Sequence, residues 1–131
     1  MKKGIVAGLG LAVLAGCGGS RLADQRAQAI LALPGPQYFA ELRVARDLAD
    51  RCSAYVFDEK LAADMRETRA KSGAQSETQI AGAVDLEVSI KRRSVAAAND
   101  GVDYEELNTC RVLNSEVARM TPLSVLVLNK G

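Results

Sequence analysis

Hydrophobic and polar positions recur along most of the chain with the period of an α-helix. Between residues 38 and 57, apolar residues return every three or four positions, and charged residues fill most of the positions between them. The apolar residues that share a face are Leu42, Ala45, Ala49, Cys52 and Val56. We therefore predict a helix with one buried face, which residues 53–57 either continue or interrupt.

A second helix is predicted to begin at Asp58 and to end at Gly73. Glycine adopts the left-handed backbone conformation that commonly follows a helix, so Gly73 is a suitable end point. The inner face of this helix is expected to contain Leu61 and Met65, with Thr68 as a further candidate.

A third, longer helix is predicted over residues 77–98. Ser76 and Gln79 have the spacing of a capping box, in which the two side chains bind backbone N–H groups at the start of a helix. The stretch from Asn99 to Gly101 is expected to end it. The inner seam consists of Ile80, Val84, Val88 and Val95, with Leu86 and Ile90 beside it.

The last predicted helix covers residues 104–119. Asp103 and Glu106 form a second capping-box pattern, and acidic residues suit the positive end of a helix dipole. Thr121 and Pro122 are expected to end the helix. Its inward residues are Leu107, Cys110, Val117 and either Leu113 or Asn114.

The chain then closes on six mostly branched apolar residues, which have the propensity of a strand. No other segment has a strand-like pattern. We expect this tail either to pack across the helices as a closing element or to act as a docking strand for a partner. The candidate partner-binding residues are Leu123, Val125, Leu126, Val127 and Leu128.

Together these elements predict an all-α fold, a small bundle of about four helices. Residues 20–33 also favour a helix, but Pro34 and Pro36 break any helix that forms there. We expect this segment to be either a tether with one short helix or a disordered linker.

The most apolar part of the chain lies at its start. Lys2 and Lys3 precede an uncharged run over residues 4–15. As a helix this run would span roughly 18 Å, which is too short for a hydrocarbon core of about 30 Å. A positive start, a short apolar run and small residues at its end are typical of a secretory signal peptide.

The signal peptide ends in Leu14-Ala15-Gly16-Cys17, which resembles the lipobox of bacterial lipoproteins. The resemblance implies removal of residues 1–16 and attachment of acyl chains such as palmitate to Cys17, which anchors the protein in a membrane. Gly18, where an inner-membrane retention signal has aspartate, implies the outer membrane and by default its periplasmic side. The chain then divides into a cleaved segment (1–16), a lipidated tether (17–36) and a helical domain (37–131).

The other two cysteines predict a disulfide. If Cys17 is lipidated, Cys52 and Cys110 remain as a pair in an oxidising compartment. Two free buried thiols or part of a metal site are the alternatives. A two-cysteine metal site needs further ligands, and the chain has no histidine.

Composition excludes several kinds of chemistry. The chain has 17 Lys and Arg, 16 Asp and Glu, and no histidine. Without Lys2 and Lys3, 15 basic and 16 acidic residues leave a net charge of −1, so no basic excess favours nucleic-acid binding. The absence of histidine removes the commonest general base and metal ligand. We expect no metal and no cofactor.

The remaining candidate groups have structural explanations. The acid pairs Asp47/Asp50 and Asp58/Glu59 could act in acid–base catalysis, but such pairs are common on helix surfaces. Lys91, Arg92 and Arg93 could touch anionic lipid headgroups or form a solvated helix face. A cluster that could hold Ca²⁺ or simply form a turn and a helix cap consists of Asp100, Asp103, Glu105 and Glu106.

Arg51-Cys52 and Thr109-Cys110-Arg111-Val112 resemble corresponding parts of a family of small exported bacterial helical domains of unknown function. The resemblance covers about residues 43–126 and implies a disulfide-linked domain without catalytic activity. We expect a non-enzymatic envelope lipoprotein, tethered to the outer membrane, that binds another envelope component. A periplasmic inhibitor, immunity protein or stress chaperone is the alternative, and a carboxylate-based enzyme is the third hypothesis.

Overall fold

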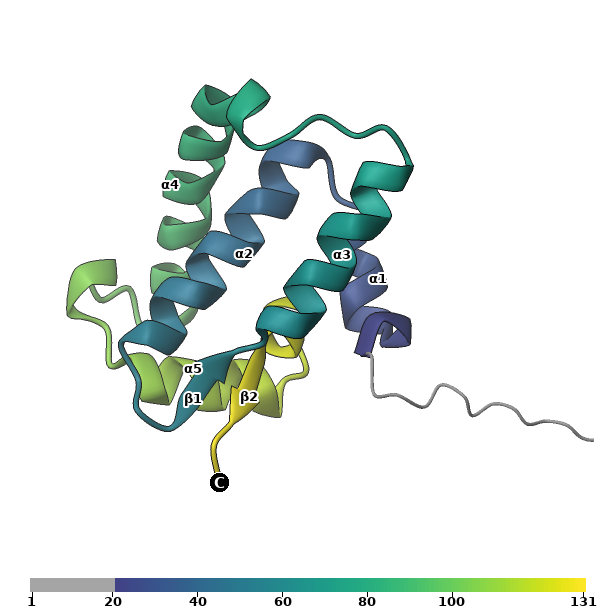
Figure 1. The fold of residues 1–131 in the computed structure, drawn as a ribbon. Helices are drawn as coiled ribbons and strands as arrows, with labels where there is room; N and C mark the ends of the chain where they lie inside the picture. Colours follow the sequence, from purple (N-terminus) through teal and green to yellow (C-terminus); the bar gives the residue numbers. More distant parts are fainter. Residues whose placement is uncertain (1–20) are drawn as a thin grey trace, which may run out of the picture.

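The computed structural model describes residues 21–131, so the predicted signal peptide, the lipobox and Cys17 lie outside the described part. Within residues 21–131, five α-helices surround a common core, and Figure 1 shows α2 between α3 and α4, with α5 crossing below them. The prediction of an all-α fold is confirmed, with the addition of one small sheet. The elements are α1 (Gln25–Leu31), α2 (Gly35–Asp50), β1 (Tyr55–Phe57), α3 (Glu59–Lys71), α4 (Ala81–Ala98), α5 (Thr109–Ala118) and β2 (Val127–Asn129).

The central position of α2 follows from its broad apolar surface. Ala45, Ala49 and Cys52 are buried as the spacing predicts, but Leu42 is only partly buried. Val44 and Leu48, which the single-face pattern omitted, are completely buried. The buried face of α2 is therefore wider than predicted, because other elements pack against it from more than one side.

The segment predicted as a tether contains α1, which belongs to the folded domain. Ala27 and Ile30 have no exposed surface and join the core. Asp24 caps the helix by accepting a hydrogen bond from the Arg26 backbone at 2.8 Å. The hydrogen bond from the Arg26 side chain lowers the pKa of Asp24 to about 2. The short helix is thus confirmed, and residues 25–31, which were assigned to the tether, pack with the helical domain.

The apolar tail is part of the core. Pro122–Leu126 forms a 3₁₀ helix, η5, and β2 pairs antiparallel with β1, so that Val56 lies opposite Leu128. The expectation of a closing element is confirmed. Leu128 is 39% exposed, and the other four candidate partner-binding residues are buried within this chain: Leu123, Val125, Leu126 and Val127.

The sheet also corrects the prediction for residues 53–57. This stretch interrupts the helix and forms β1, where no strand was predicted. Phe57 faces the core and Val56 is 44% exposed. Three residues are too few for an alternating pattern to be recognised, and the strand forms only because the distant β2 supplies its hydrogen-bond partners.

Cys52 and Cys110 form the predicted disulfide, with an S–S distance of 1.97 Å and a Cα–Cα distance of 5.1 Å. The bond joins the segment that follows α2 to the first turn of α5. Beside it, the Thr109 hydroxyl donates a hydrogen bond of 2.6 Å to the backbone carbonyl of Arg51. The end of α2 and the start of α5 are therefore fixed to each other.

The first capping box is confirmed. The Ser76 backbone N–H donates to the Gln79 side chain at 2.8 Å, and the Gln79 backbone N–H donates to the Ser76 hydroxyl at 3.4 Å. They open a 3₁₀ turn over Thr78–Ile80 that leads directly into α4. Asp100 and Gly101 follow this helix in the left-handed conformation, as expected from the predicted end point.

The second capping box does not open the last helix. Asp103 caps only the 3₁₀ turn Tyr104–Glu106, after which the buried Leu107 is extended. The helix α5 begins at Thr109, where Asn108 accepts a hydrogen bond from the Arg111 backbone at 3.1 Å. The predicted start at residue 104 is therefore wrong, since the backbone is extended at the buried Leu107 and the α-helix begins only at Thr109.

The inner faces of the other helices are largely as predicted. Leu61, Met65, Val84 and Val95 are buried, and so are Leu107 and Leu113. Four predicted or neighbouring positions face solvent: Thr68, Leu86, Ile90 and Val117.

Candidate functional site

The acid pairs that the sequence suggested take part in contacts within the fold. Asp47 accepts hydrogen bonds from Arg51 and from the Tyr104 hydroxyl, both at 3.0 Å. Asp58 caps α3 and forms an ion pair of 2.8 Å with Arg21. The neighbouring acids of the two pairs lie at the surface: Asp50 and Glu59.

The acidic cluster after α4 is likewise used for turns and ion pairs. Asp103 accepts a hydrogen bond from the Glu105 backbone at 2.9 Å. Asp100 pairs with Arg111. Among the described residues, no group of three or more Asp, Glu or Cys is placed to hold a metal ion.

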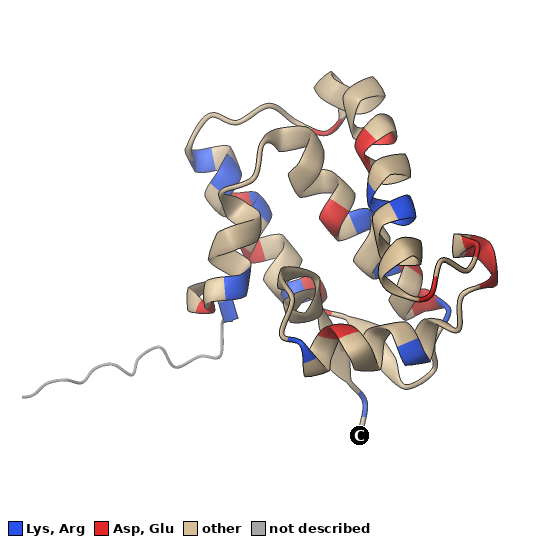
Figure 2. Cartoon of the chain, turned by 180° about the vertical axis from the view of Figure 1, so that it is seen from behind, with Lys and Arg blue, Asp and Glu red and all other residues tan. Residues whose placement is uncertain are grey.

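Two members of the basic run are paired within the fold. Lys91 forms an ion pair of 2.8 Å with Glu41, and Arg92 forms one of 2.9 Å with Glu105. Arg93 is exposed. Figure 2 shows acidic and basic residues interspersed over the helices, so this run is one part of a mixed surface.

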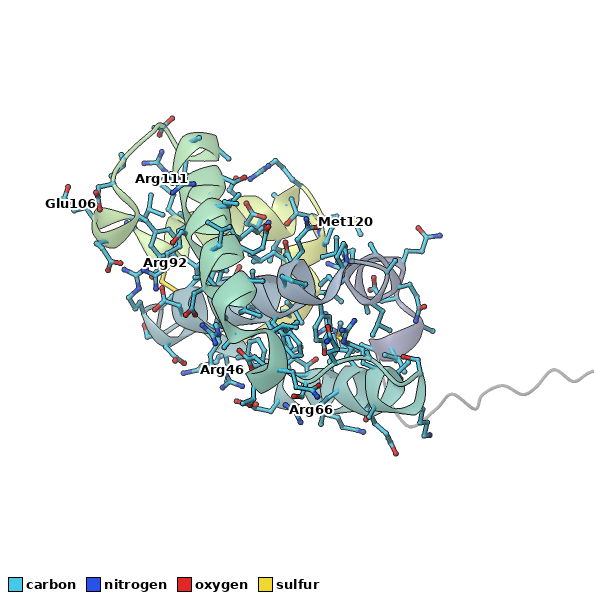
Figure 3. All side chains as sticks on the ribbon, turned by 90° about the horizontal axis from the view of Figure 1, so that it is seen from above. Arg46, Arg66, Arg92, Glu106, Arg111 and Met120 are labelled. Atoms are coloured by element: carbon cyan, nitrogen blue, oxygen red, sulfur yellow. A yellow bond between two sulfur atoms is a disulfide. The ribbon has the colours of Figure 1, made fainter. Side chains whose placement is uncertain are left out.

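A groove of about 290 Å³ lies between the first half of α2 and the second half of α3, and the segment that joins α3 to α4 closes one end. A narrower hollow of about 120 Å³ continues it along α2 towards Phe57. Arg46 and Arg66, which both line this hollow, lie on one side of the molecule in Figure 3, away from Arg92 and Arg111. The groove is lined by Tyr38, Phe39, Arg66, Arg69, Ala70, Ala74 and Glu77, with Gln75 and Ser76 at its end.

Aromatic rings and arginines form the wall of this groove. Tyr38 and Phe39 meet edge to face, with ring centroids 4.8 Å apart. The Arg69 guanidinium lies over both rings, 4.3 Å from the Tyr38 centroid and 5.5 Å from that of Phe39. Gly35 makes room at the start of α2, because a Cβ there would lie 3.4 Å from an Arg69 nitrogen and 2.9 Å from Ile80.

Two hydrogen-bond donors in this wall have no partner in the described part of the chain. Tyr38 has no exposed surface, and its hydroxyl is unpaired. The Arg69 Nε is also buried without an acceptor. Burial raises the pKa of the Tyr38 hydroxyl, so the group keeps its proton and its capacity to donate. Buried polar groups are normally satisfied, so such a pair beside a groove points to a ligand.

The charge at the groove is slightly positive. Arg43 pairs with Glu77 at 2.7 Å and with Asp85 at 2.9 Å, and Arg46 pairs with Glu59 at 2.5 Å. Arg66 and Arg69 form no ion pair with another described residue. These four arginines and three carboxylates therefore leave one net positive charge.

A second hollow, of about 250 Å³, lies on the other side of α2, against α4. Glu41 borders it, and one of its carboxylate oxygens is buried without a hydrogen-bond partner. The other oxygen is held by Lys91 at 2.8 Å, so the charge of this buried group is already balanced. The groove between α2 and α3 is the stronger candidate, since Arg69 forms no such ion pair.

Sequence reasoning did not find this groove. The available signals were the adjacent aromatic residues Tyr38 and Phe39, and the spacing of Arg66 and Arg69, which places both on one face of a helix. Neither signal shows that α2 and α3 bring the two pairs together. The site depends on how the helices pack.

Comparison of the chain with protein-family models, characterised proteins and solved structures finds no match. The resemblance to a family of exported helical domains thus stays a prediction. No helix within residues 21–131 is both long and apolar enough to cross a membrane.

Proposed function

We propose that this protein is a non-enzymatic lipoprotein of the bacterial cell envelope whose helical domain binds another envelope component in the groove between α2 and α3. The lipobox motif ending at Cys17 supports the anchor and the outer-membrane location. The Cys52–Cys110 disulfide is in keeping with export to an oxidising compartment.

The observation that carries the binding role is the unpaired hydroxyl of Tyr38. An unsatisfied buried donor costs about 1–3 kcal/mol, and a bound partner that accepts the hydrogen bond would remove that cost. The apolar tail was the earlier candidate surface, but its burial moves the proposed interface to the groove.

The proposed anchor would hold the groove close to the membrane. Arg21, the first described residue, is four residues after Cys17. Four residues span at most about 14 Å when fully extended. A partner would therefore have to lie in the same membrane or reach close to its surface.

Intact mass spectrometry of protein purified from bacterial membranes tests the anchor. We expect a chain that starts at Cys17 and carries three acyl chains, with two further cysteines that react with an alkylating agent only after reduction. A Cys17→Ser variant should lose the lipid mass and leave the membrane fraction. An unlipidated wild-type chain with an intact signal segment would contradict the proposal.

Photo-crosslinking in intact cells tests the interface. A crosslinking residue at Ala74 lies in the groove, whereas the same residue at the exposed Leu86 on α4 serves as the control. We expect one defined product from position 74, which Arg69→Gln abolishes, and none from position 86. Equal products from both positions, or a product that does not depend on Arg69, would contradict a groove interface.

The identity of the crosslinked product separates the two classes of function. A structural envelope component fits the proposed tethered binding protein. A folded enzyme whose activity falls on binding would instead favour the inhibitor or immunity-protein alternative.

A further inference from the structure

Two buried donors on residues that line the groove between α2 and α3 have no acceptor among the described residues. The Tyr38 hydroxyl and the Arg69 Nε are buried and unpaired, and Arg66 adds a second cation at the edge. An arginine nitrogen can only donate. A ligand that satisfies both groups must therefore accept two hydrogen bonds, on one oxygen or on two.

At the other end of α2, a tyrosine and an arginine hold one of the protein's own carboxylates. The Asp47 carboxylate accepts hydrogen bonds from the Tyr104 hydroxyl and from Arg51, both at 3.0 Å. The Arg51 guanidinium also lies over the Tyr104 ring, 5.1 Å from its centroid. A tyrosine with an arginine stacked on it is thus an internal example of a carboxylate site.

Charge favours a monoanion over a dianion. The arginines and carboxylates at the groove leave one net positive charge, because the carboxylates of Glu77, Asp85 and Glu59 already pair with Arg43 and Arg46. A carboxylate would neutralise this charge. A phosphate dianion would leave an excess negative charge beside Glu77.

The apolar part of the wall indicates what the carboxylate is attached to. Phe39, Ala70 and Ala74 contribute apolar surface next to the two donors, in a groove of about 290 Å³. A volume of this order accommodates a small side chain in addition to the carboxylate.

We propose that the groove binds a carboxylate carried on a small apolar group, with Tyr38 and Arg69 donating hydrogen bonds to it and Arg66 contributing charge. This inference rests on the proposed function of the groove as a binding site. The carboxylate could belong to a small organic acid or to the C-terminal residue of a peptide, and both present the same chemistry.

Titration with N-acetyl-leucine, followed by NMR of ¹³C-labelled tyrosine rings, tests the inference on the mature chain extracted from membranes in non-ionic detergent. We expect saturable shifts of the Tyr38 signals. The signals of Tyr55 and Tyr104 serve as internal controls, because their hydroxyls are already bonded to Asn114 and Asp47. N-acetyl-leucinamide, which lacks the charge, and inorganic phosphate should bind at least tenfold more weakly.

Variants locate the contacts. Tyr38→Phe should weaken binding of N-acetyl-leucine about tenfold or more, and Arg69→Lys should do the same because lysine keeps the charge but lacks the Nε. Arg66→Gln should have a smaller effect, about threefold. Arg93→Gln, on the exposed face of α4, is the matched control and should change nothing.

A peptide that ends in leucine with a free carboxylate distinguishes the two sources. Tighter binding than N-acetyl-leucine would assign the groove to a chain terminus, and equal binding would assign it to a small acid. The carboxylate inference is overturned if the amide binds as well as the acid, if phosphate binds more tightly, or if Tyr38→Phe leaves the affinity unchanged. In those cases an Arg69-dependent crosslink from position 74 would still support the proposed function.

Discussion

Arginine side chains stack on a tyrosine ring at each end of α2, but the two clusters differ in how their polar groups are satisfied. In the closed cluster, formed by Tyr104, Asp47, Arg51 and Arg92, the two arginines lie 5.1 and 4.9 Å from the ring centroid. In the open cluster, formed by Tyr38, Phe39, Arg66 and Arg69, Arg69 lies 4.3 Å from the Tyr38 centroid. The ring chemistry is the same at both ends.

The difference lies in the carboxylates. Asp47 satisfies both Tyr104 and Arg51, and Glu105 pairs with Arg92 at 2.9 Å, so that only the Arg92 Nε lacks a partner in the closed cluster. Asp47 accepts a hydrogen bond from the Tyr104 hydroxyl, but no described carboxylate accepts one from the Tyr38 hydroxyl. A stacked arginine and tyrosine therefore stabilise the fold where the chain provides the acceptor, and are suited to binding where it does not.

The two clusters also differ in how firmly the chain around them is linked to the rest of the fold. The closed cluster lies beside the Cys52–Cys110 disulfide and the hydrogen bond from Thr109 to the Arg51 carbonyl. The open cluster lies between the start of α2 and the end of α3, and α3 is followed by an exposed segment, residues 72–76. The disulfide thus restrains the closed end, and no described disulfide restrains the open end.

The largest expected effect comes from removing the disulfide. Its sequence separation is 58, and in the chain-entropy treatment such a bond contributes about 4 kcal/mol to the free energy of unfolding. The double variant Cys52→Ala/Cys110→Ala should lose about that amount in urea denaturation. Shifts of the Tyr38 signals with N-acetyl-leucine should persist below the unfolding transition, and their loss would show that the two ends are not independent.

The next effect separates the two tyrosines directly. Tyr104→Phe removes a made hydrogen bond and should lower the free energy of unfolding by about 1 kcal/mol. Tyr38→Phe removes an unpaired buried hydroxyl, so it should leave stability unchanged or raise it slightly. Parallel urea denaturation of the two variants checks the comparison. Equal destabilisation by both would mean that Tyr38 has a partner in the folded protein.

The smallest effect appears at alkaline pH. Burial, followed by the charge of Asp47, raises the pKa of Tyr104 well above its usual range, and burial raises that of Tyr38. Both hydroxyls keep their protons to a higher pH in the folded state than in the unfolded chain. The free energy of unfolding is therefore retained below pH 10 and falls as the pH rises above 10. Between pH 10 and 11 Tyr104 should account for about 1 kcal/mol of this loss, and Tyr38 should contribute in the same direction.

Urea denaturation at pH 9, 10 and 11 measures this fall. Tyr38→Phe and Tyr104→Phe should each make it shallower than in the wild-type protein. An unchanged slope in the Tyr104→Phe variant would contradict the burial and the Asp47 contact of that hydroxyl.

Much of the fold was predictable from local patterns. The Ser76–Gln79 capping box, the ends of helices at Gly73 and Gly101, and the pairing of Cys52 with Cys110 all depend on residues close in sequence or on simple counting. The incorrect predictions have a different cause. The strand β1, the burial of the tail and the start of α5 at Thr109 each depend on a distant part of the chain.

The candidate site belongs to this second group. Tyr38 and Arg69 are 31 residues apart, and each taken alone has an ordinary explanation in a helix. Their significance comes from a buried, unpaired hydroxyl and a buried, unpaired Nε on two residues that line the same groove. The hydrophobic periodicity of a sequence does not show whether a buried donor has an acceptor in the folded protein.

The sequence by itself determined the helical class, the candidate disulfide and the lipobox resemblance on which the proposed anchor rests, because periodicity, cysteine number and a short apolar start are local properties. Only the tertiary structure decided which end of α2 is closed and which is open. Hydrogen-bond satisfaction depends on side chains that meet from distant segments, and the chain brings a carboxylate to Tyr104 but none to Tyr38.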